Sequence, residues 1–393
     1  MSSAHTNKNL ATYTGLKYQS TTLAPVYDEN HIEFLIGTRS LREENEIHLV
    51  EYIEEKNEII CNRILDHKPE IWSLSSCNWD PSLLITGYNT GMEFAGSLWR
   101  IKTQEEREKA GDFSDMEKLV DFNGFNGRIK SILFDPTGEN KEKVISVDER
   151  SIQIWNLNKN EKEKEAKLDN KINVGELEVI TASAWDFLQP HQFATSNESS
   201  LRIWDLRTLK ETQEIEHAQG GAIRDLAFNR NKPWHIATAG DDFLINFWDL
   251  RNTKEFVYQN KQPQALITLA GHSHWVWNIE FNPIYDQLLL SSSTDSTVKL
   301  WNVPSFAFEL LLEDEDESDK TRLSRGNRRR QKSARSKRQG HDGLAKSYDS
   351  HEDSVYAISW SPFEPWIFAS VSYDGKLVVS HVPEKLKDEI SLN

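Results

Sequence analysis

The sequence predicts an all-β fold in which seven small sheets close into a ring, and three observations predict it. Tryptophan is frequent, with 13 residues, and many of them stand at the same place in short strand-like segments. These segments alternate in polarity and are rich in β-branched and aromatic residues, as strands are. They also recur along the whole chain. One small sheet cannot bury both of its faces, whereas a closed ring of sheets can.

Each segment has one position near its end that is usually Trp. We call this position the slot and use it to count the repeats in chain order. It is occupied in turn by Val50, Trp99, Trp155, Trp204, Trp248, Trp301 and Ser380. In the first unit we expect strands at 15–20, 33–37 and 46–52. The last unit needs one more strand, either from 388–392 or from the first dozen residues, and the sequence leaves both open.

Each unit has the same internal order. An apolar stretch that often ends in aromatic-x-Pro, as in IEFNP (279–283), is followed by a strand of small residues such as LLLSSS (288–293). A turn with an acid six residues before the slot comes next, and a histidine opens several units. These residues are Asp242, Asp295 and Asp374, and His67, His217, His272 and His351. The order resembles the WD40 repeat, which implies a seven-bladed WD40 β-propeller.

The resemblance gives the histidines and acids a structural role. In WD40 repeats a loop His bonds the turn Asp, and a strand hydroxyl and the Trp ring N–H complete the network. His272 with Asp295, Thr297 or a nearby Ser, and Trp301 fits this pattern best. The same role is expected for His351, Asp374, Asp242 and Trp248. Buried polar groups must be paired, so we expect neither a metal site nor catalysis from these residues.

Composition and charge narrow the classes of function. The formal net charge is −16, which repels phosphate backbones, so nucleic-acid binding is not expected. Two cysteines, Cys61 and Cys77, make no disulfide framework and indicate a reducing compartment. We see no signal peptide, no membrane-spanning run and no motif for catalysis or cofactor binding. The expectation is a cytoplasmic, non-enzymatic protein without cofactors.

The chain is expected to form one propeller over 14–393, preceded by a flexible segment, 1–13. The longest interval between slots contains a charged insertion, 313–343, in the connection between the sixth and seventh blades. It begins with six acids in 313–319 and continues with ten basic residues in 320–338, a pattern typical of disorder. A flexible loop, a nuclear-import patch, a contact to an acidic partner or membrane, and phosphorylation at Ser333 or Ser336 remain open. The charged stretches 103–118 and 158–171 are expected to be surface loops.

A partner site follows from the WD40 resemblance. In these propellers the residues three and five after the loop His, and the residue before the turn Asp, line the rim of the top face. Counting in this way, or back from the closing aromatic of the strand, selects Glu70, Trp72, Arg128, Arg224, Asp241, Trp275, Trp277, Tyr356 and Tyr373. Aromatic residues with a polar tip dominate binding hot spots. The expected function of this rim is protein binding.

A closer resemblance covers nearly the whole chain. HSHWVWN (272–278) and SYDG (372–375) are not part of the generic repeat. Together with 33–52 and 351–383 they resemble the EARP and GARP complex-interacting protein family, also known as the tumour-suppressing subchromosomal transferable-fragment WD-repeat family. The basic half of the insertion and the position of His217 depart from it.

This resemblance implies a monomeric adaptor, within a larger assembly, that binds the EARP and GARP vesicle-tethering complexes. It implies peripheral localisation at the trans-Golgi network and endosomes. It also implies that the protein supports endosomal recycling, retrograde transport to the trans-Golgi network and dense-core vesicle biogenesis.

A rival interpretation comes from the sequence WDLR, which ends two consecutive blades. It resembles the docking motif of cullin-4 ubiquitin-ligase substrate receptors, with Asp205, Arg207, Asp249 and Arg251 as contacts to a DDB-type adaptor. WDLR is also close to the repeat consensus, in which the Asp forms a turn. A nuclear histone-binding propeller, guided by the basic run, is the third possibility.

Overall fold

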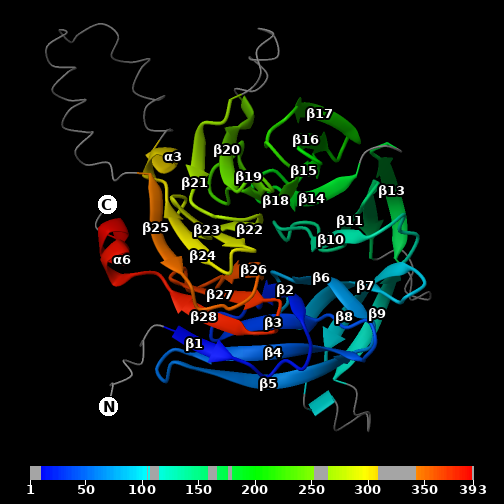
Figure 1. The fold of residues 1–393 in the computed structure, drawn as a ribbon. Coiled ribbons are helices and arrows are strands. Elements are labelled where there is room, and N and C mark those ends of the chain that lie inside the picture. The colour runs from blue at the N-terminus through cyan, green and yellow to red at the C-terminus, as the bar shows by residue number, and fades with distance from the viewer. Residues whose placement is uncertain are drawn as a thin grey trace, which may run out of the picture.

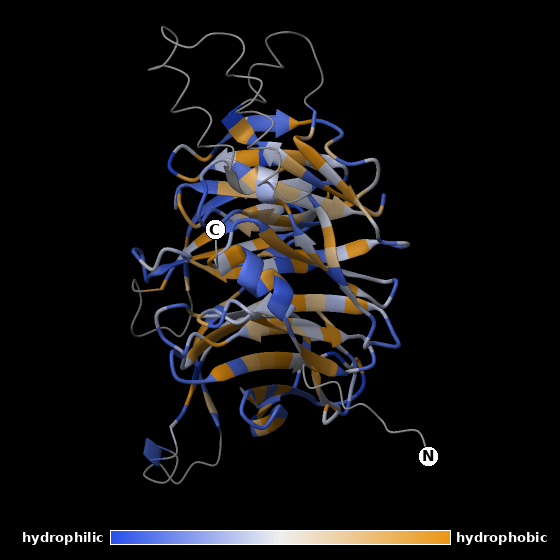
Figure 2. Ribbon diagram, turned by 90° about the vertical axis from the view of Figure 1, so that its left-hand side faces the viewer, coloured by the Kyte–Doolittle hydropathy of each residue, from blue (hydrophilic) through white to orange (hydrophobic). Residues whose placement is uncertain are grey.

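A computed structural model shows seven four-stranded antiparallel sheets arranged radially around a central axis (Figure 1). The structure describes residues 10–103, 105–106, 115–157, 166–175, 179–251, 264–308 and 342–391. The predicted seven-bladed β-propeller is therefore confirmed. Hydrophobic residues gather in the strands, and hydrophilic ones are frequent in the connections at both ends (Figure 2).

The first four blades use consecutive strands, ordered from the axis outwards. Blade 1 is β2 (Ser20–Pro25), β3 (Ile32–Thr38), β4 (Asn45–Ile53) and β5 (Glu58–His67). Blade 2 is β6 (Glu70–Ser76), β7 (Leu83–Asn89), β8 (Phe94–Ile101) and β9 (Met116–Phe122). Blade 3 is β10 (Ile129–Phe134), β11 (Lys143–Asp148), β12 (Ser151–Asn156) and β13 (Lys167–Asn173). Blade 4 is β14 (Ile180–Trp185), β15 (Gln192–Asn197), β16 (Ser200–Asp205) and β17 (Lys210–Ile215).

The remaining blades follow the same plan until the ring closes. Blade 5 is β18 (Ile223–Phe228), β19 (His235–Gly240), β20 (Leu244–Asp249) and β21 (Ile267–Ala270). Blade 6 is β22 (Val276–Phe281), β23 (Leu288–Ser293), β24 (Val298–Asn302) and β25 (Gly343–Tyr348). Blade 7 is β26 (Val355–Trp360), β27 (Ile367–Ser372), β28 (Leu377–His381) and, as its outer strand, β1 (Leu10–Tyr13).

The N-terminus closes the ring. Strand β1 pairs antiparallel with β28, from Leu10 opposite Ser380 to Tyr13 opposite Leu377. The prediction that 1–13 is a flexible segment is thus wrong for residues 10–13, which form a strand. Residues 1–9 lie outside the described part of the chain. In the other candidate, 388–392, the described residues 388–391 are not a strand, because Glu384–Ser391 forms helix α6.

Three further predictions about where the strands lie are wrong. The opening strand of blade 1 is β2 rather than 15–20, because pairing with β3 begins only at Ser20. The expected loops 103–118 and 158–171 each run into an outer strand, β9 and β13. Most residues of β13 are exposed and polar, so its sequence has no apolar alternation.

Hydrophobic packing joins each blade to the next. Seven clusters of buried side chains each combine residues of two neighbouring blades. Between blades 5 and 6, for example, Phe247 packs against Phe281 with ring centroids 5.9 Å apart. Leu386 and Ile390 of α6 join the cluster between blades 6 and 7. Both faces of every sheet are therefore covered, as the repeat required.

The ring has two faces, which differ in the connections between strands that they carry. The top face carries the connections between blades and those between the second and third strands, and the bottom face carries the others. Most of the expected insertion, 313–341, lies outside the described residues. Its flanks, helix α3 (Pro304–Phe308) and Asp342, meet where the Ser305 backbone N–H donates to the Asp342 carboxylate over 3.0 Å. No helix in the described ranges is both long and apolar enough to cross a membrane.

Candidate functional site

A β-bulge at the start of every inner strand builds the top rim. In each blade the pairing of the first two strands skips one residue, which leaves that residue without a partner opposite it. From blade 1 to blade 7 the skipped residues are Thr21, Trp72, Lys130, Thr181, Arg224, Trp277 and Tyr356. A bulge turns a side chain away from the regular alternation. Four of the expected rim residues are bulge residues.

Two cavities meet at this rim. A mouth cavity of about 880 Å³ is lined by side chains that include Trp72, Arg128, Trp277 and Tyr373. A channel cavity of about 490 Å³ lies along the inner strands. Four bulge residues line both cavities: Thr21, Trp72, Trp277 and Tyr356. These residues form a collar around the channel entrance.

On one side of the collar, Trp72 is held between two guanidinium groups. The Cζ atoms of Arg39 and Arg128 lie 3.4 Å and 5.1 Å from its ring centroid. Cations on indole faces are attracted by the ring quadrupole. Phe94 closes the edge of the ring at 5.9 Å. The Trp72 Nε1–H is buried and has no hydrogen-bond acceptor among the described residues.

Glu70 is a supporting residue of this side, not an exposed contact. It is only 6% exposed, and its carboxylate accepts hydrogen bonds from Arg39 Nε over 2.9 Å and Asn89 Nδ2 over 3.3 Å. Counting from the loop His, the turn Asp or the closing aromatic missed Arg39. It lies in the six-residue connection 39–44 of blade 1, which is longer than the four-residue turn 294–297 of blade 6.

On the other side, aromatic rings follow one another across blades 6 and 7. Trp277 contacts Tyr356 edge-on at 4.8 Å between centroids, and Tyr356 contacts Tyr373 at 5.6 Å. Burial, followed by the charges of Tyr373 and Asp353, raises the pKa of Tyr356, so the phenol stays protonated. Its hydroxyl therefore remains available as a donor at the rim.

Arg224 joins blade 5 to this aromatic series. It makes a bidentate ion pair with Asp241, with N–O distances of 2.6 Å and 2.7 Å. Its Cζ lies 5.3 Å from the Trp275 ring and 5.1 Å from the Trp277 ring. Trp275 is 38% exposed and does not line the mouth cavity. The structure thus brings Trp72, Trp277, Tyr356 and Tyr373 around one cavity and places Trp275 outside it.

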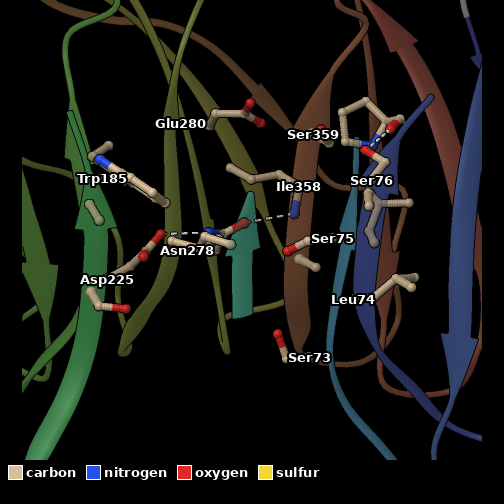
Figure 3. A pocket seen from close by; sticks show the side chains of 18 of the residues that line it. Ser73, Leu74, Ser75, Ser76, Trp185, Asp225, Asn278, Glu280, Ile358 and Ser359 are labelled. Atoms are coloured by element: carbon tan, nitrogen blue, oxygen red, sulfur yellow. Dashed lines mark hydrogen bonds between the residues drawn. The ribbon is translucent and has the colours of Figure 1, made fainter. Parts of the chain in front are cut away.

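Below the collar, polar side chains connect the inner strands across the channel (Figure 3). Asp225 Oδ2 accepts hydrogen bonds from Asn278 Nδ2 over 2.5 Å and from the Ile279 backbone N–H over 2.8 Å. Asn278 Oδ1 in turn accepts from the Ile358 N–H over 2.9 Å. Burial raises the pKa of Asp225 to about 7. Hydrogen bonds therefore join the neighbouring inner strands of blades 5, 6 and 7.

The sixth blade contains the hydrogen-bond network described for His272. Its Nδ1 lies 2.9 Å from Asp295 Oδ2, and its Nε2 lies 2.7 Å from Ser291 Oγ, which accepts from Trp301 Nε1 over 2.8 Å. Burial lowers the pKa of His272, so the ring is neutral and Ser291 donates to Nε2. Burial alone would raise the pKa of Asp295, but hydrogen bonds from His272 and Thr297 hold it well below the usual range.

In other blades different residues complete the corresponding hydrogen-bond network. In blade 5 His217 lies outside it, and Gln219 takes its place by donating to Asp242 over 3.2 Å and accepting from Thr238 over 3.0 Å. Trp248 Nε1 donates to Thr238 over 3.1 Å.

In blade 7 His351 does not reach Asp374 directly. Ser372 Oγ lies 2.9 Å from His351 Nδ1 and donates to Asp374 over 2.5 Å. The sequence pattern gave no signal for Gln219 or for this serine bridge.

The two WDLR segments form local ion pairs at the bottom face. Arg207 Nη2 lies 2.9 Å from Asp205, and Arg251 Nη2 lies 2.8 Å from Asp249. The hydrogen bond from Arg207 lowers the pKa of Asp205 to about 2. The side chain of Arg207 is 65% exposed, whereas that of Arg251 is 33% exposed. Both pairs lie at the end opposite to the collar.

Comparison with known proteins decides the family. Residues 8–301 match the EIPR1 beta-propeller family model, and residues 343–379 match the WD domain, G-beta repeat. The chain belongs to the EIPR1 β-propeller family. The resemblance found from HSHWVWN and SYDG is thereby confirmed.

Relatives of this EIPR1 family member match over nearly its whole length. EARP and GARP complex-interacting protein 1 of Homo sapiens is 36% identical over 402 residues, covering 96% of this chain and 98% of that protein. The EARP-interacting protein homolog of Dictyostelium discoideum is 34% identical and covers 96% of both chains. WD repeat-containing protein DWA2 of Arabidopsis thaliana is 34% identical, covering 94% of this chain and 95% of that protein.

Proposed function

We propose that this chain is a non-enzymatic adaptor that binds the EARP and GARP tethering complexes through the aromatic rim of its top face. The names of the human and Dictyostelium relatives support the choice of partner. One structural observation supports the choice of surface: Trp275, Trp277, Tyr356 and Tyr373 form a series of neighbouring aromatic rings, in which Arg224 joins Trp275 to Trp277. Aromatic and Arg side chains are the groups that dominate protein–protein hot spots.

In this proposal the protein positions a tethering complex and performs no chemistry of its own. It acts as a monomer within the larger assembly, in the cytoplasm and peripherally at endosomes and the trans-Golgi network. Its loss would impair endosomal recycling, retrograde transport to the trans-Golgi network and dense-core vesicle biogenesis. A segment of a tether subunit occupies the rim, with Trp275 and Trp277 as its main contacts.

The test is co-precipitation of tether subunits by the tagged full-length chain. The double variant Trp275→Ala, Trp277→Ala is expected to reduce their recovery ~10-fold or more, because hot-spot tryptophans contribute most of the binding energy. The matched control is Arg207→Ala, Arg251→Ala, which removes two large side chains at the opposite face. Thermal unfolding of both variants checks that the ring remains folded. Undiminished recovery with the tryptophan variant would reject the site.

The control variant also tests the rival function. Arg207 is exposed at the end of β16, as a docking residue for a cullin-4 ligase adaptor of the DDB type would have to be. If the wild-type chain co-precipitates that adaptor and Arg207→Ala, Arg251→Ala abolishes the recovery, the ligase function is supported instead. The histone-binding alternative depends on 320–338, which lies outside the described residues.

A further inference from the structure

The turn between β19 and β20 places an aromatic residue at a position with a left-handed backbone. Five residues before the slot, blades 5, 6 and 7 have Phe243, Ser296 and Gly375, with φ of +67°, +63° and +80°. This left-handed backbone suits glycine, because a Cβ is close to the following carbonyl oxygen there. A bulky residue in this conformation is unusual and lowers the stability of the turn. Phe243 therefore has no advantage for folding at this position.

The ring of Phe243 is directed to the surface, not to the core. It is 37% exposed, and it belongs to none of the seven hydrophobic clusters between the blades. It stacks on His274, with centroids 5.8 Å apart and planes inclined by 21°. His274 contacts Trp275 at 4.9 Å. Phe243 thus extends the aromatic rim outwards over blade 5.

The resulting surface is called the aromatic strip. It consists of Phe243, His274, Trp275, Arg224, Trp277, Tyr356 and Tyr373, with successive neighbours 4.8 to 5.8 Å apart. It crosses the tops of blades 5, 6 and 7 without a break. Phe243 and Trp275 have the largest exposure among its aromatic residues. An extended peptide segment could contact several of its rings at once.

The charges along the strip favour a basic ligand. The positive charge of Arg224 is neutralised by its bidentate pair with Asp241. Four nearby carboxylates make no ion pair among the described residues: Asp242, Glu352, Asp353 and Asp374. Asp242 and Asp374 stand in the two turns at the ends of the strip, and Asp353 precedes Tyr356 by three residues. Lys376 beside them directs its ammonium group to the Ser350 carbonyl over 2.7 Å.

Contacts within the rim indicate which kind of chemical group packs against its aromatic rings. Guanidinium groups already lie near indole rings in four contacts, where Arg224 contacts Trp275 and Trp277 and where Arg39 and Arg128 contact Trp72. A cation is attracted to an aromatic face, and carboxylates nearby attract the same cation through their negative charge. The outer part of the strip, at Phe243 and Trp275, offers the same faces to a side chain from outside.

We infer that the aromatic strip binds an extended peptide segment of the partner that contains arginine or lysine, and that Phe243 is a direct contact for it. This inference rests on the proposed function and adds to it the chemistry of the bound segment. It explains why a residue unfavourable for the turn occupies position 243.

The test uses a displayed library of random 12-residue peptides selected on the purified full-length chain. Peptides recovered on the wild type are expected to contain more Arg and Lys than Asp and Glu. Their recovery on Phe243→Gly is expected to fall ~10-fold or more, as for other aromatic hot-spot residues. The matched control is Ser296→Gly, which makes the same backbone change in blade 6 without removing a ring. Because glycine suits both positions, both variants are expected to unfold at or above the wild-type temperature.

Two results would overturn the inference: selected peptides that are mainly acidic, or equal recovery on the wild type and on Phe243→Gly. Co-precipitation separates this failure from that of the proposed function. If Trp275→Ala, Trp277→Ala loses the tether subunits and Phe243→Gly retains them, only the present inference fails. If both variants retain them, the rim is not the tether site at all.

Discussion

Arg224 illustrates how one side chain makes the rim rigid before any partner arrives. The bulge in β18 takes it out of the regular strand alternation, Asp241 binds two nitrogens of its guanidinium group, and two indole rings lie against it. A long arginine side chain normally loses much rotamer freedom when it is ordered on binding. Here that loss has already occurred on folding. A preformed rim binds more tightly for this reason.

Asp225, the next residue, makes the stability of the ring depend on pH. Its pKa is about 7 in the folded protein because of burial, compared with about 4 in an unfolded chain. The folded state therefore binds the proton more tightly, so the free energy of unfolding is highest below pH ~4 and decreases as the pH rises to ~7. Asp225→Asn removes this dependence and keeps an oxygen acceptor for Ile279. We expect the variant to equal the wild type at pH 4 and to exceed it at pH 8 by up to ~4 kcal/mol.

Denaturant unfolding of both proteins from pH 4 to pH 8 measures this difference. Glu280, whose pKa is also raised by burial, titrates in both proteins, so the comparison retains only its coupling to Asp225, whose pKa it helps to raise. A constant difference across the pH range would contradict the prediction, because it would mean that Asp225 is charged in the folded state throughout. A variant less stable at every pH would show instead that the amide cannot replace the carboxylate in the bond network.

At the scale of single residues, the sequence predicted some of the residues of the rim. Counting from the loop His selected Trp72, Trp277 and Tyr356, because the bulge falls at the same place in every blade and keeps the count constant. It missed Arg39, since the connection in blade 1 is longer than in the other blades. Phe243 carried a signal that was not used: a phenylalanine at a position where Gly375 shows the need for a left-handed backbone.

At the scale of elements, strand β1 decides how firmly the ring is closed. It supplies the outer edge of blade 7, buries Ala11, and places the Tyr13 hydroxyl 2.9 Å from His48 Nδ1 in blade 1. The Asn57 side chain also donates to the Leu10 carbonyl over 3.2 Å. The first and last segments of the chain are thus held together within one sheet. The pairing covers the edge of β28, which would otherwise be exposed.

Deletion of residues 1–13 is therefore expected to lower the unfolding temperature by ~3–6 °C, the effect of a few kcal/mol in a chain of this size. The loss comes from the backbone pairing with β28 and from the exposed edge left behind. Deletion of residues 1–9 alone leaves β1 in place and is expected to change the temperature by less than ~1 °C. Calorimetry of the two truncated chains distinguishes them. Equal unfolding temperatures would mean that β1 contributes nothing to closure.

The elements differ in how well the sequence predicted them. The inner strands of a blade have strong apolar signals, because each face packs against a neighbouring blade. IEFNP and LLLSSS of the sixth blade fall on β22 and β23, whereas the opening strand of the first blade was misplaced. The outer strands β9 and β13 were missed, since they lie at the perimeter and much of their surface faces water. The identity of the closing strand depends on contacts between the two ends of the chain, which no local pattern contains.

At the scale of the whole molecule, net charge and rim chemistry agree. The chain has 62 acidic and 46 basic residues, a formal charge of −16, so its field attracts cationic segments from a distance. Charge complementarity of this kind acts mainly on the rate of association, whereas short-range packing sets the rate of dissociation. The acidic body of the propeller therefore guides a basic segment to the rim, and the aromatic strip retains it.

If the bound segment is basic, association between the propeller and the purified tethering complex must depend on ionic strength. We expect the association rate constant to fall ~10-fold between ~20 mM and ~500 mM salt, because screening shortens the reach of the field, with a smaller change in dissociation. The variant Glu352→Lys, Asp353→Lys changes the net charge from −16 to −12 beside the strip. It should associate more slowly than the wild type at low salt and at nearly the same rate at high salt. Surface-immobilised propeller and a salt series give both rate constants. A wild-type association rate that rises with salt would mean that the partner segment is acidic, since screening would then relieve repulsion.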